Sequence, residues 1–197
     1  MSSQRYLLKN GSLPDGTVSD LLISDGVIAS ISSAISDPEA TLINIKGSVV
    51  LPGLVDLHTH LRQPGREDAE TVLTGSRSGA KGGFTALSAM ANTSPVADNA
   101  GVVEQVYRLG QEAGLLDVFP IGAVTQGLSG VALSEIGAMA DSIAQVRVFS
   151  DDGNCVFDPM VMRRALEYIK KFDGVQTCAL PIPSLLSSSL FCGSSAL

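Results

Sequence analysis

The sequence is poor in residues that several classes of protein require. Its 197 residues include no tryptophan, and 13 lysines and arginines stand against 20 aspartates and glutamates, for a net charge of −7 at pH 7. Nucleic-acid binding needs a basic surface, and no basic patch is present, so the charge balance argues against a nucleic-acid partner. The composition, with 45% hydrophobic residues and 20 glycines, is typical of a soluble α/β protein.

Cysteine is also scarce, and its spacing does not form a disulfide framework. The three cysteines, Cys155, Cys178 and Cys192, are odd in number and show no paired spacing, which favours a reducing compartment. The first nine residues lack the pattern of a secretory signal peptide, and no apolar run reaches membrane-spanning length. We therefore expect a cytoplasmic protein that does not bind a membrane.

Residues 1–50 form the first expected domain, a small β-rich segment. Apolar runs predict strands near residues 6–8, 18–23, 27–31 and 42–45. Asp25-Gly26 between two of them predicts a tight turn, because such a turn requires positive φ. The segment is too small to bury much surface alone, so we expect it to pack on further strands in a β-sandwich.

From residue 51 to 174, expected strands alternate with expected helices. Strands are predicted at 49–57, 84–90, 118–124 and 146–149, and helices at 69–81, 99–112, 133–140 and 159–172. This order predicts a parallel sheet with right-handed crossovers. Four such units make half of a (β/α)8 TIM barrel. A doubly wound sheet is the alternative, although no Gly-x-Gly-x-x-Gly follows any strand.

Both histidines of the chain lie at the end of the first barrel strand. His58 and His60 are two residues apart, so in a strand their side chains project to the same side, where they can hold one divalent cation. Arg62 shares this parity if the strand stays extended that far. A His-x-His pair can also be two polar residues at a strand end, and only its context favours a metal site.

That context is a set of polar residues at the ends of the other strands. Asn92, then Thr125 and Gln126, then Asp151 and Asp152 follow the three later strands. In a parallel barrel these ends converge on one pocket. Two histidines and a carboxylate suit zinc. Taken alone, Asp151-Asp152-Gly153 is typical of a turn with a helix cap.

Three motifs resemble a known family. Residues 52–65, Pro-Gly-Leu-Val-Asp-Leu-His-Thr-His-Leu-Arg-Gln-Pro-Gly, are similar to the first-strand signature of the amidohydrolase superfamily, and more narrowly of the bacterial type I dihydroorotases. Residues 90–96, Met-Ala-Asn-Thr-Ser-Pro-Val, and 149–153, Phe-Ser-Asp-Asp-Gly, resemble the second and fourth strand ends of that family. The likeness covers roughly residues 5–174.

The resemblance implies a zinc-dependent enzyme of pyrimidine biosynthesis that interconverts N-carbamoyl-L-aspartate and L-dihydroorotate. It implies that His58 and His60 bind a first zinc and that Asp151 bridges to a second where one is present, with Asp152 as the alternative ligand. Arg62 and Asn92 would hold the substrate carboxylate, and a guanidinium suits that task because it pairs with carboxylates in a bidentate manner. The general acid and base would be an aspartate beyond the likeness, so no catalytic residue is assigned.

Related functions remain as alternatives. Hydantoinases and allantoinases share the His-x-His strand but usually bridge two metals with a carboxylated lysine on the fourth strand, where this chain has Arg147. Some dihydroorotase-like chains are non-catalytic scaffold partners of aspartate transcarbamoylase, and the retained His58, His60 and Asp151 favour an enzyme instead. The complete protein is expected to form a homo-oligomer, with aspartate transcarbamoylase as a candidate partner.

Residues 175–197 depart from the family. They contain no charged residue, six serines and two cysteines, and they have the period of neither a helix nor a strand. Residues 176–182 resemble the translation of a sequencing-library adapter, so we expect the tail to be an artefact, with a genuine terminus or a membrane anchor interrupted by Pro181 and Pro183 as alternatives. With four of eight units, the chain as written is expected to be aggregation-prone and catalytically inactive.

Overall fold

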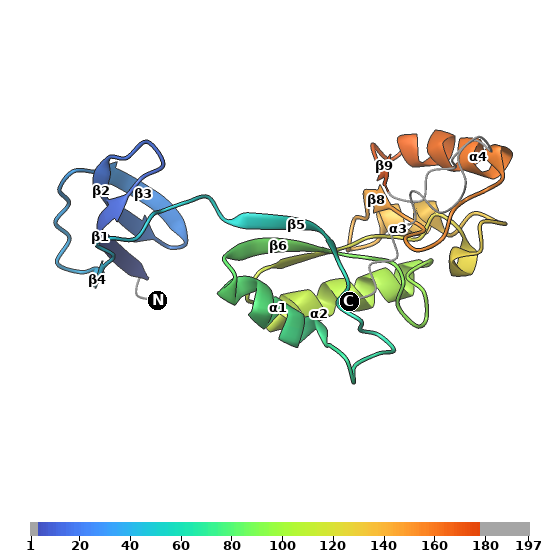
Figure 1. Ribbon diagram of the computed structural model, residues 1–197, viewed down its shortest axis with the longest axis horizontal. Helices are drawn as coiled ribbons and strands as arrows, with labels where there is room; N and C mark the ends of the chain where they lie inside the picture. Colours follow the sequence, from blue (N-terminus) through green and yellow to red (C-terminus); the bar gives the residue numbers. More distant parts are fainter. Residues whose placement is uncertain (1–3, 178–197) are drawn as a thin grey trace. The chain divides into compact units, whose positions relative to one another are not determined.

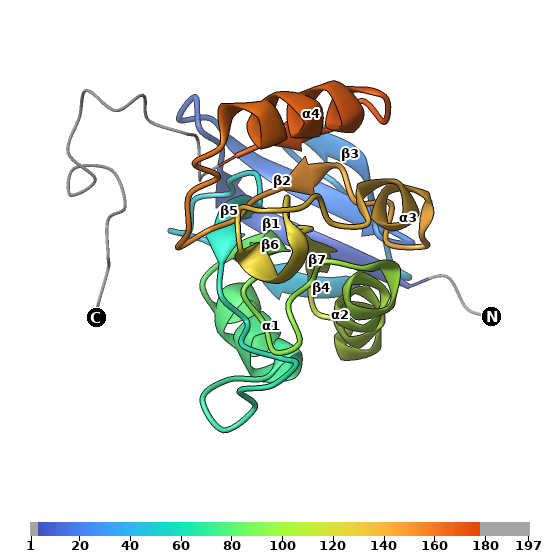
Figure 2. The ribbon, with the colours of Figure 1, turned by 90° about the vertical axis from the view of Figure 1, so that its right-hand side faces the viewer.

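Two compact units make up the chain, and the boundary between them falls between Pro52 and Gly53. The structure is a computed structural model and describes residues 4–177 (Figure 1, Figure 2). The described residues of the first unit form one β-sheet, and those of the second form two. Between residues 4 and 177, no helix has the length and apolar character needed to span a membrane.

The N-terminal unit is a four-stranded sheet. Its strands are β1 (Arg5–Ser12), β2 (Val18–Ser24), β3 (Val27–Ser32) and β4 (Thr41–Asn44), in the order β3-β2-β1-β4. β2 pairs antiparallel with β1 and β3, whereas β4 pairs parallel with β1. Asp25 and Gly26, with φ of 51° and 80°, form the tight turn that the sequence predicts. Residues 4–52 form no second sheet, so the sandwich stays a prediction.

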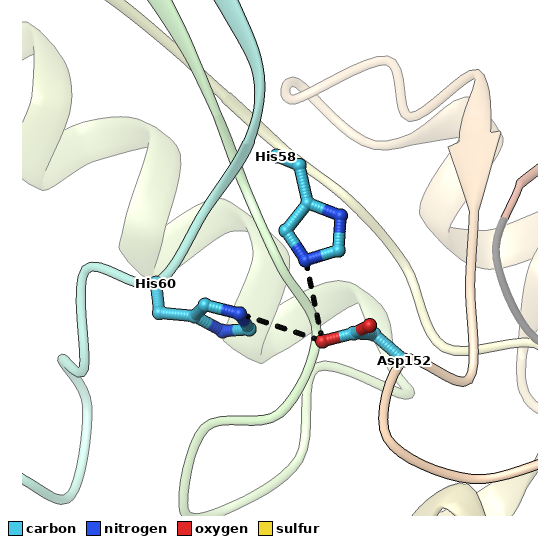
Figure 3. A group of neighbouring side chains, drawn as sticks. All are labelled: His58, His60 and Asp152. Carbon is cyan, nitrogen blue, oxygen red and sulfur yellow. Dashed lines mark ion pairs between the residues drawn. The ribbon is translucent and has the colours of Figure 1, made fainter. Parts of the chain in front are cut away.

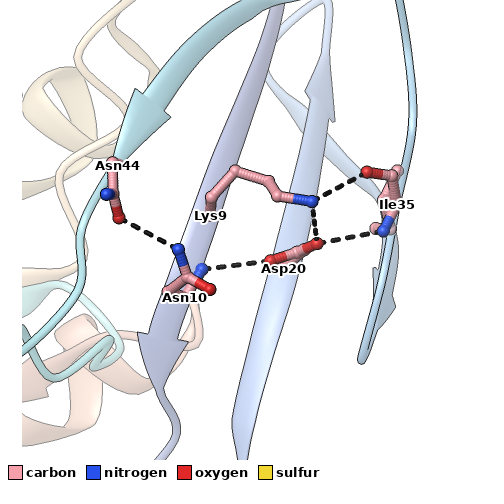
Figure 4. Close-up of polar contacts among 5 residues, drawn as sticks. All are labelled: Lys9, Asn10, Asp20, Ile35 and Asn44. Atoms are coloured by element: carbon pink, nitrogen blue, oxygen red, sulfur yellow. Dashed lines mark hydrogen bonds and ion pairs between the residues drawn. The ribbon is translucent and has the colours of Figure 1, made fainter.

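A partly buried ion pair joins the first two strands of this sheet. The Nζ atom of Lys9 lies 2.6 Å from Oδ2 of Asp20, whose side chain is only 3% exposed (Figure 4). Asp20 also accepts hydrogen bonds from the backbone N–H groups of Asn10 and Ile35, each at 3.0 Å. Together, the Lys9 ammonium and these N–H groups lower the pKa of Asp20 from 3.8 to about 2. The ionised carboxylate therefore links β1, β2 and the segment after β3.

This network predicts a dependence of the stability of the N-terminal unit on pH. Because the folded-state pKa of Asp20 lies below 3.8, its carboxylate stabilises the fold at pH values above about 4, and this contribution is lost as pH falls towards about 2. Asp20→Asn should abolish the contribution. We expect the difference in unfolding free energy between wild type and Asp20→Asn to be constant from pH 7 to about 4 and to shrink below it.

Urea titrations followed by the amide NMR signals of β1 and β2 measure this difference. Glu39→Gln is the matched control, because Glu39 is an exposed carboxylate in the same unit. A wild-type stability advantage that stays constant down to pH 2 would contradict the role of Asp20.

The second unit is built on parallel strands. β5 (Leu54–Thr59), β6 (Phe84–Ala89) and β7 (Asp117–Pro120) form one sheet in that order, and β8 (Val148–Phe149) pairs parallel with β9 (Val175–Gln176). A parallel bridge between Gly122 and Phe149 connects the chain after β7 to β8. The order along the chain is therefore also the order in space, as the strand–helix alternation predicts. These are units of an α/β fold, and closure into a barrel stays a prediction.

Residues 121–125 continue β7 but change hydrogen-bonding partners at each step. The backbone N–H of Ile121 donates to the Ala89 carbonyl, that of Gly122 to Val148 and that of Ala123 to Ala97, at 2.8, 3.1 and 2.8 Å. The next two N–H groups donate to the side chain of Asp151. This alternation explains why the regular strand ends at Pro120 and not at residue 124 as predicted. We call residues 121–125 the junction segment.

The helices begin and end at recognisable caps. α1 (Val72–Lys81) starts after Thr71, whose side chain accepts a hydrogen bond from the backbone N–H of Thr74, so it begins three residues later than predicted. α2 (Ala100–Ala113) is capped by Asn99 and ends at Gly114 with φ 59°. The remaining helices are the 3-10 turn η1 (Gln126–Leu128), α3 (Ile136–Asp141) and α4 (Pro159–Lys170). α1 contacts β6 and α2, and α4 contacts β9 and α3 (Figure 1).

The main hydrophobic core of the second unit is formed by its later elements. The largest cluster of buried side chains includes Val124, Ile136, Met139, Phe149 and Ile169, and it spans α3, β8 and α4. A second cluster joins α1, β6 and α2. β5 differs from the prediction of a strand buried on both faces, because Leu54, Val55 and Leu57 are 49%, 55% and 74% exposed. The physical reason is that β5 is an edge strand that pairs with β6 alone within residues 4–177.

The first residues of the C-terminal tail are paired. The backbone N–H of Val175 donates to Arg147 O at 2.8 Å and that of Thr177 to Phe149 O at 2.9 Å. The sequence predicted no strand there because β9 is only two residues long, which is too short for a period to show. The rest of the predicted artefact tail, residues 178–197, lies outside the described residues.

Candidate metal centre

The two histidines lie where β5 ends. β5 reaches Thr59, so His58 is in the strand and His60 directly follows it. Asp56 accepts a hydrogen bond from the backbone N–H of His58 at 3.0 Å, and Met90 N donates to Thr59 O at 2.8 Å. The backbone at His58 is therefore held by β5 itself, and the backbone between the two histidines by the residue after β6.

Both imidazoles point toward one carboxylate oxygen. The Nε2 atoms of His58 and His60 each lie 3.5 Å from Oδ2 of Asp152, in the loop after β8 (Figure 3). The two ring centroids are 5.1 Å apart and the rings are inclined by 69°. One nitrogen from each histidine and one Asp152 oxygen lie within 4.8 Å of one another. Parity along β5 and convergence of strand ends together bring these three residues into one group.

Asn92, which follows β6, fixes the orientation of His60. The Nδ1 atom of His60 lies 2.9 Å from Oδ1 of Asn92. Because an amide oxygen only accepts hydrogen bonds, Nδ1 must carry the proton, and in a neutral imidazole Nε2 then carries the lone pair. That lone pair faces the Asp152 carboxylate, which is another acceptor. Two acceptors that face each other are stabilised by a positive charge between them, which either a metal ion or the second proton of an imidazolium supplies.

The donor set fits a divalent transition metal. Zinc with bonds of 2.0–2.2 Å in tetrahedral geometry has ligand atoms roughly 3.3–3.6 Å apart. The two separations between the histidine nitrogens and Asp152 Oδ2, 3.5 Å each, agree with this spacing, and all three atoms lie within 4.8 Å of one another. The partly buried position of Asp152 and His60 leaves the group open on one side. Three protein donors with an open side can hold a metal ion and leave it a position for water.

The two neighbouring aspartates occupy different environments. The sequence prediction took Asp151 as the metal ligand and Asp152 as the alternative, and the structure brings Asp152, not Asp151, to the histidines. The Asp151 side chain is fully buried and accepts hydrogen bonds from Val124 N at 2.8 Å, Thr125 N at 3.0 Å and the Thr125 hydroxyl. Burial raises the pKa of Asp151, and the bonds from Thr125 and Val124 oppose that rise.

The physical reason for this difference is the direction of consecutive side chains. β8 ends at Phe149 and the Asp-Asp pair lies in the turn that follows it, where the Asp151 side chain is directed to Val124 and Thr125 and that of Asp152 to the histidines. The sequence does not say which of the two faces the histidines, because both residues are aspartates and the strand end could not be placed to within one residue.

Arg62 lies beyond the strand, in a turn. The expectation that it shares the parity of the histidines required an extended chain, but β5 ends at Thr59 and Arg62 has φ 59°. Its side chain is exposed, and its carbonyl accepts a hydrogen bond from Arg66 N at 3.0 Å. Of the two residues predicted to bind substrate, Asn92 therefore touches the histidine group, and Arg62 lies on the adjoining loop. Gln126, also predicted near the site, is exposed in η1.

Comparison with known proteins identifies the family. A family model described as dihydro-orotase-like matches residues 47–175, the segment that carries the three motifs and the histidine group. The chain belongs to the dihydroorotase-like family. A dihydroorotase from Leifsonia xyli subsp. xyli is 60% identical over 175 residues, and one from Streptomyces coelicolor is 59% identical over 171 residues.

The dihydroorotase-like match covers most of this chain and less than half of its relatives. It spans 89% and 87% of this chain, and about 40% of each of the two relatives. A solved L-hydantoinase (dihydropyrimidinase) from Arthrobacter aurescens superposes with a TM-score of 0.70 at 26% identity, covering 90% of this chain and 40% of that one. The fold is therefore that of amidohydrolase-type enzymes.

The contact between His60 and Asn92 generates a prediction. In Asn92→Ala the Nδ1 atom of His60 loses its acceptor, so we expect the Nε2–H tautomer, which free histidine favours, to gain population in the metal-free protein at pH 8. Long-range ¹H–¹⁵N correlation spectra of the imidazole measure the tautomer. Asn154→Ala is the matched control, since Asn154 is an exposed asparagine in the loop after β8. An unchanged His60 tautomer in Asn92→Ala would mean that Asn92 does not orient the ring.

Proposed function

We propose that the protein is a zinc-dependent cyclic amidohydrolase of the dihydroorotase type, which interconverts N-carbamoyl-L-aspartate and L-dihydroorotate. The observation that carries the proposal is the group of His58, His60 and Asp152, whose ligand atoms lie within 4.8 Å of one another. The dihydroorotases that are 60% and 59% identical support the choice of substrate. Because the chain spans about 40% of those relatives, the proposal concerns the complete protein.

In this proposal His58, His60 and Asp152 hold the metal, one or two ions in each complete subunit. A cyclic amide is a poor electrophile, and a bound zinc ion would supply Lewis acidity and lower the pKa of water to about 7. The residues of this chain provide position and charge. Asn92 holds His60 with its Nε2 lone pair toward Asp152, and this partner on the far side of the ring is of the kind that supports metal-ligating histidines.

The same asparagine can serve the substrate. Its Oδ1 is taken by His60, whereas its Nδ2 group is a donor suited to the carboxylate of dihydroorotate. Arg62, on the loop that follows His60, would add a guanidinium that pairs with the same carboxylate. An acidic substrate beside the histidine group therefore has two proposed anchors, one on each of two neighbouring loops.

The alternatives differ in substrate or in metal. A hydantoinase or allantoinase would ordinarily need a lysine on the fourth strand, where Arg147 donates to the carbonyls of Ala140 and Val146 at 2.7 and 2.9 Å. Those contacts hold its guanidinium between the end of α3 and the residue that precedes Arg147, just before β8. A non-catalytic scaffold for aspartate transcarbamoylase would not need the metal ligands.

Metal binding is tested on the chain of 197 residues. We expect Zn²⁺ to bind with an affinity that falls more than about 100-fold in His58→Ala, His60→Ala and Asp152→Asn, because each removes a donor. Asp173→Asn is the matched control, since Asp173 is exposed and its φ of 52° is one that asparagine tolerates. Calorimetric titration with Zn²⁺ measures the affinity. Equal affinities in wild type and the three ligand variants would refute the site.

Activity is tested in a chimera. Residues 5–175 replace the matching segment of the Leifsonia xyli relative, which is 60% identical, and hydrolysis of dihydroorotate is followed by absorbance. We expect turnover within about tenfold of that relative, and a loss of more than about 100-fold when His60→Ala is added. Hydrolysis of a substituted hydantoin without turnover of dihydroorotate would favour the hydantoinase. A zinc-free complex with aspartate transcarbamoylase and no turnover would favour the scaffold.

A further inference from the structure

The residue before the proposed metal ligand makes an unusual number of contacts. Asp151 is fully buried, and its carboxylate receives two backbone N–H groups and one hydroxyl from the junction segment. The Thr125 hydroxyl that donates to Asp151 also accepts a hydrogen bond from Gly130 N at 2.8 Å. One carboxylate thus fixes the end of the junction segment and, through Thr125, the loop that contains η1.

The backbone around Asp151 is held equally firmly. Ser150 N donates to Gly122 O, and Asn154 N donates to the Asp151 carbonyl, each at 2.8 Å. The second bond closes a turn over residues 151–154, so Asp152 is the second residue of a turn whose first residue is anchored on both sides. The only peptide unit between the anchored residue and the Asp152 side chain is the one that joins the two aspartates.

We propose that Asp151 is a positioning residue that holds the Asp152 carboxylate against His58 and His60 by anchoring the 151–154 turn to the junction segment. The inference rests on the proposed metal site. In this proposal Asp151 supports the site and is not a ligand, because it lies outside the group of His58, His60 and Asp152 and both of its oxygens accept hydrogen bonds from residues 124 and 125. Removal of its carboxylate would leave two buried backbone N–H groups without acceptors, which costs free energy. The turn would shift because its backbone would rearrange to let these groups find new acceptors.

Three substitutions separate anchoring from ligation. Asp151→Ala removes every acceptor. Thr125→Val keeps the bonds from the two backbone N–H groups and removes only the hydroxyl. Asp151→Asn restores one acceptor oxygen for the two N–H groups that Oδ1 receives, and so it is the conservative rescue.

Co²⁺ is the probe, because its visible absorption reports the geometry of its ligands and its titration reports affinity. Measurements use the chain of 197 residues, with His58→Ala/His60→Ala defining the signal from other sites. We expect Asp151→Ala to weaken Co²⁺ binding about 10- to 100-fold and to change the visible spectrum, as loss of a supporting partner does in other metal sites. Asp151→Asn should recover most of the affinity and the wild-type spectrum, and Thr125→Val should fall between the two.

Several results would overturn the proposal. Wild-type affinity and spectrum in Asp151→Ala would mean that Asp152 keeps its place without the anchor. A loss in Asp151→Asn as complete as that in Asp152→Asn, with no intermediate effect of Thr125→Val, would make Asp151 a ligand. If circular dichroism shows that Asp151→Ala does not fold, the visible Co²⁺ spectrum of Thr125→Val tests the proposal instead. A Thr125→Val spectrum identical to that of wild type would count against anchoring. Failure of the proposed function is seen separately, because His58→Ala/His60→Ala would then bind Co²⁺ as wild type does.

Discussion

Burying a carboxylate is costly unless polar hydrogens meet it, and the second unit meets that cost at Asp151 with three donors from residues 124 and 125. These bonds join the end of one parallel strand to the end of the next. The histidine group depends on this connection, because His58 and His60 come from the end of β5 and Asp152 from the turn after β8. Without a fixed distance between those strand ends, one carboxylate oxygen could not lie 3.5 Å from both imidazoles.

The site therefore has two layers of polar contacts. The inner layer, His58, His60 and Asp152, gathers donors that favour a cation. The outer layer, Asn92 and Asp151, determines the direction in which inner residues point, Asn92 through a ring nitrogen and Asp151 through the backbone. Asn92 follows β6, and the turn after β8 supplies both a supporting residue, Asp151, and a member of the inner layer, Asp152. Catalytic sites that must hold a metal at fixed geometry need such support.

Sequence reasoning was most accurate where the sequence carries a clear local signal, such as an apolar run, a turn dipeptide or a helix cap. The strands of the N-terminal unit, the turn at Asp25-Gly26 and the helices capped by Thr71 and Asn99 all lie within a few residues of their predicted positions. The grouping of His58 with His60 followed from strand parity alone. The choice between Asp151 and Asp152 did not, because it depends on a shift of one residue at a strand end, and such ends are set by tertiary hydrogen bonds.

The contact between Asn92 and His60 could not be predicted from the sequence either. The positions of the strand ends do not show which polar side chains contact each other. The exposure of β5 was missed for a different reason. An apolar run predicts burial, but burial depends on what the rest of the protein supplies, and β5 forms the edge of its sheet within residues 4–177. A hydrophobic pattern thus shows that a strand is suited to burial, but it does not show which segments cover that strand.

The junction segment has a consequence for motion. Five consecutive amide groups, 121 to 125, donate to acceptors on residues 89, 148, 97 and 151, so no single local opening can free more than a part of them. Exchange of these amide hydrogens with solvent must then await the joint separation of the segments around β6, β7 and β8. The junction segment, which holds the Asp151 carboxylate, therefore behaves as one cooperative block on the timescale of hydrogen exchange.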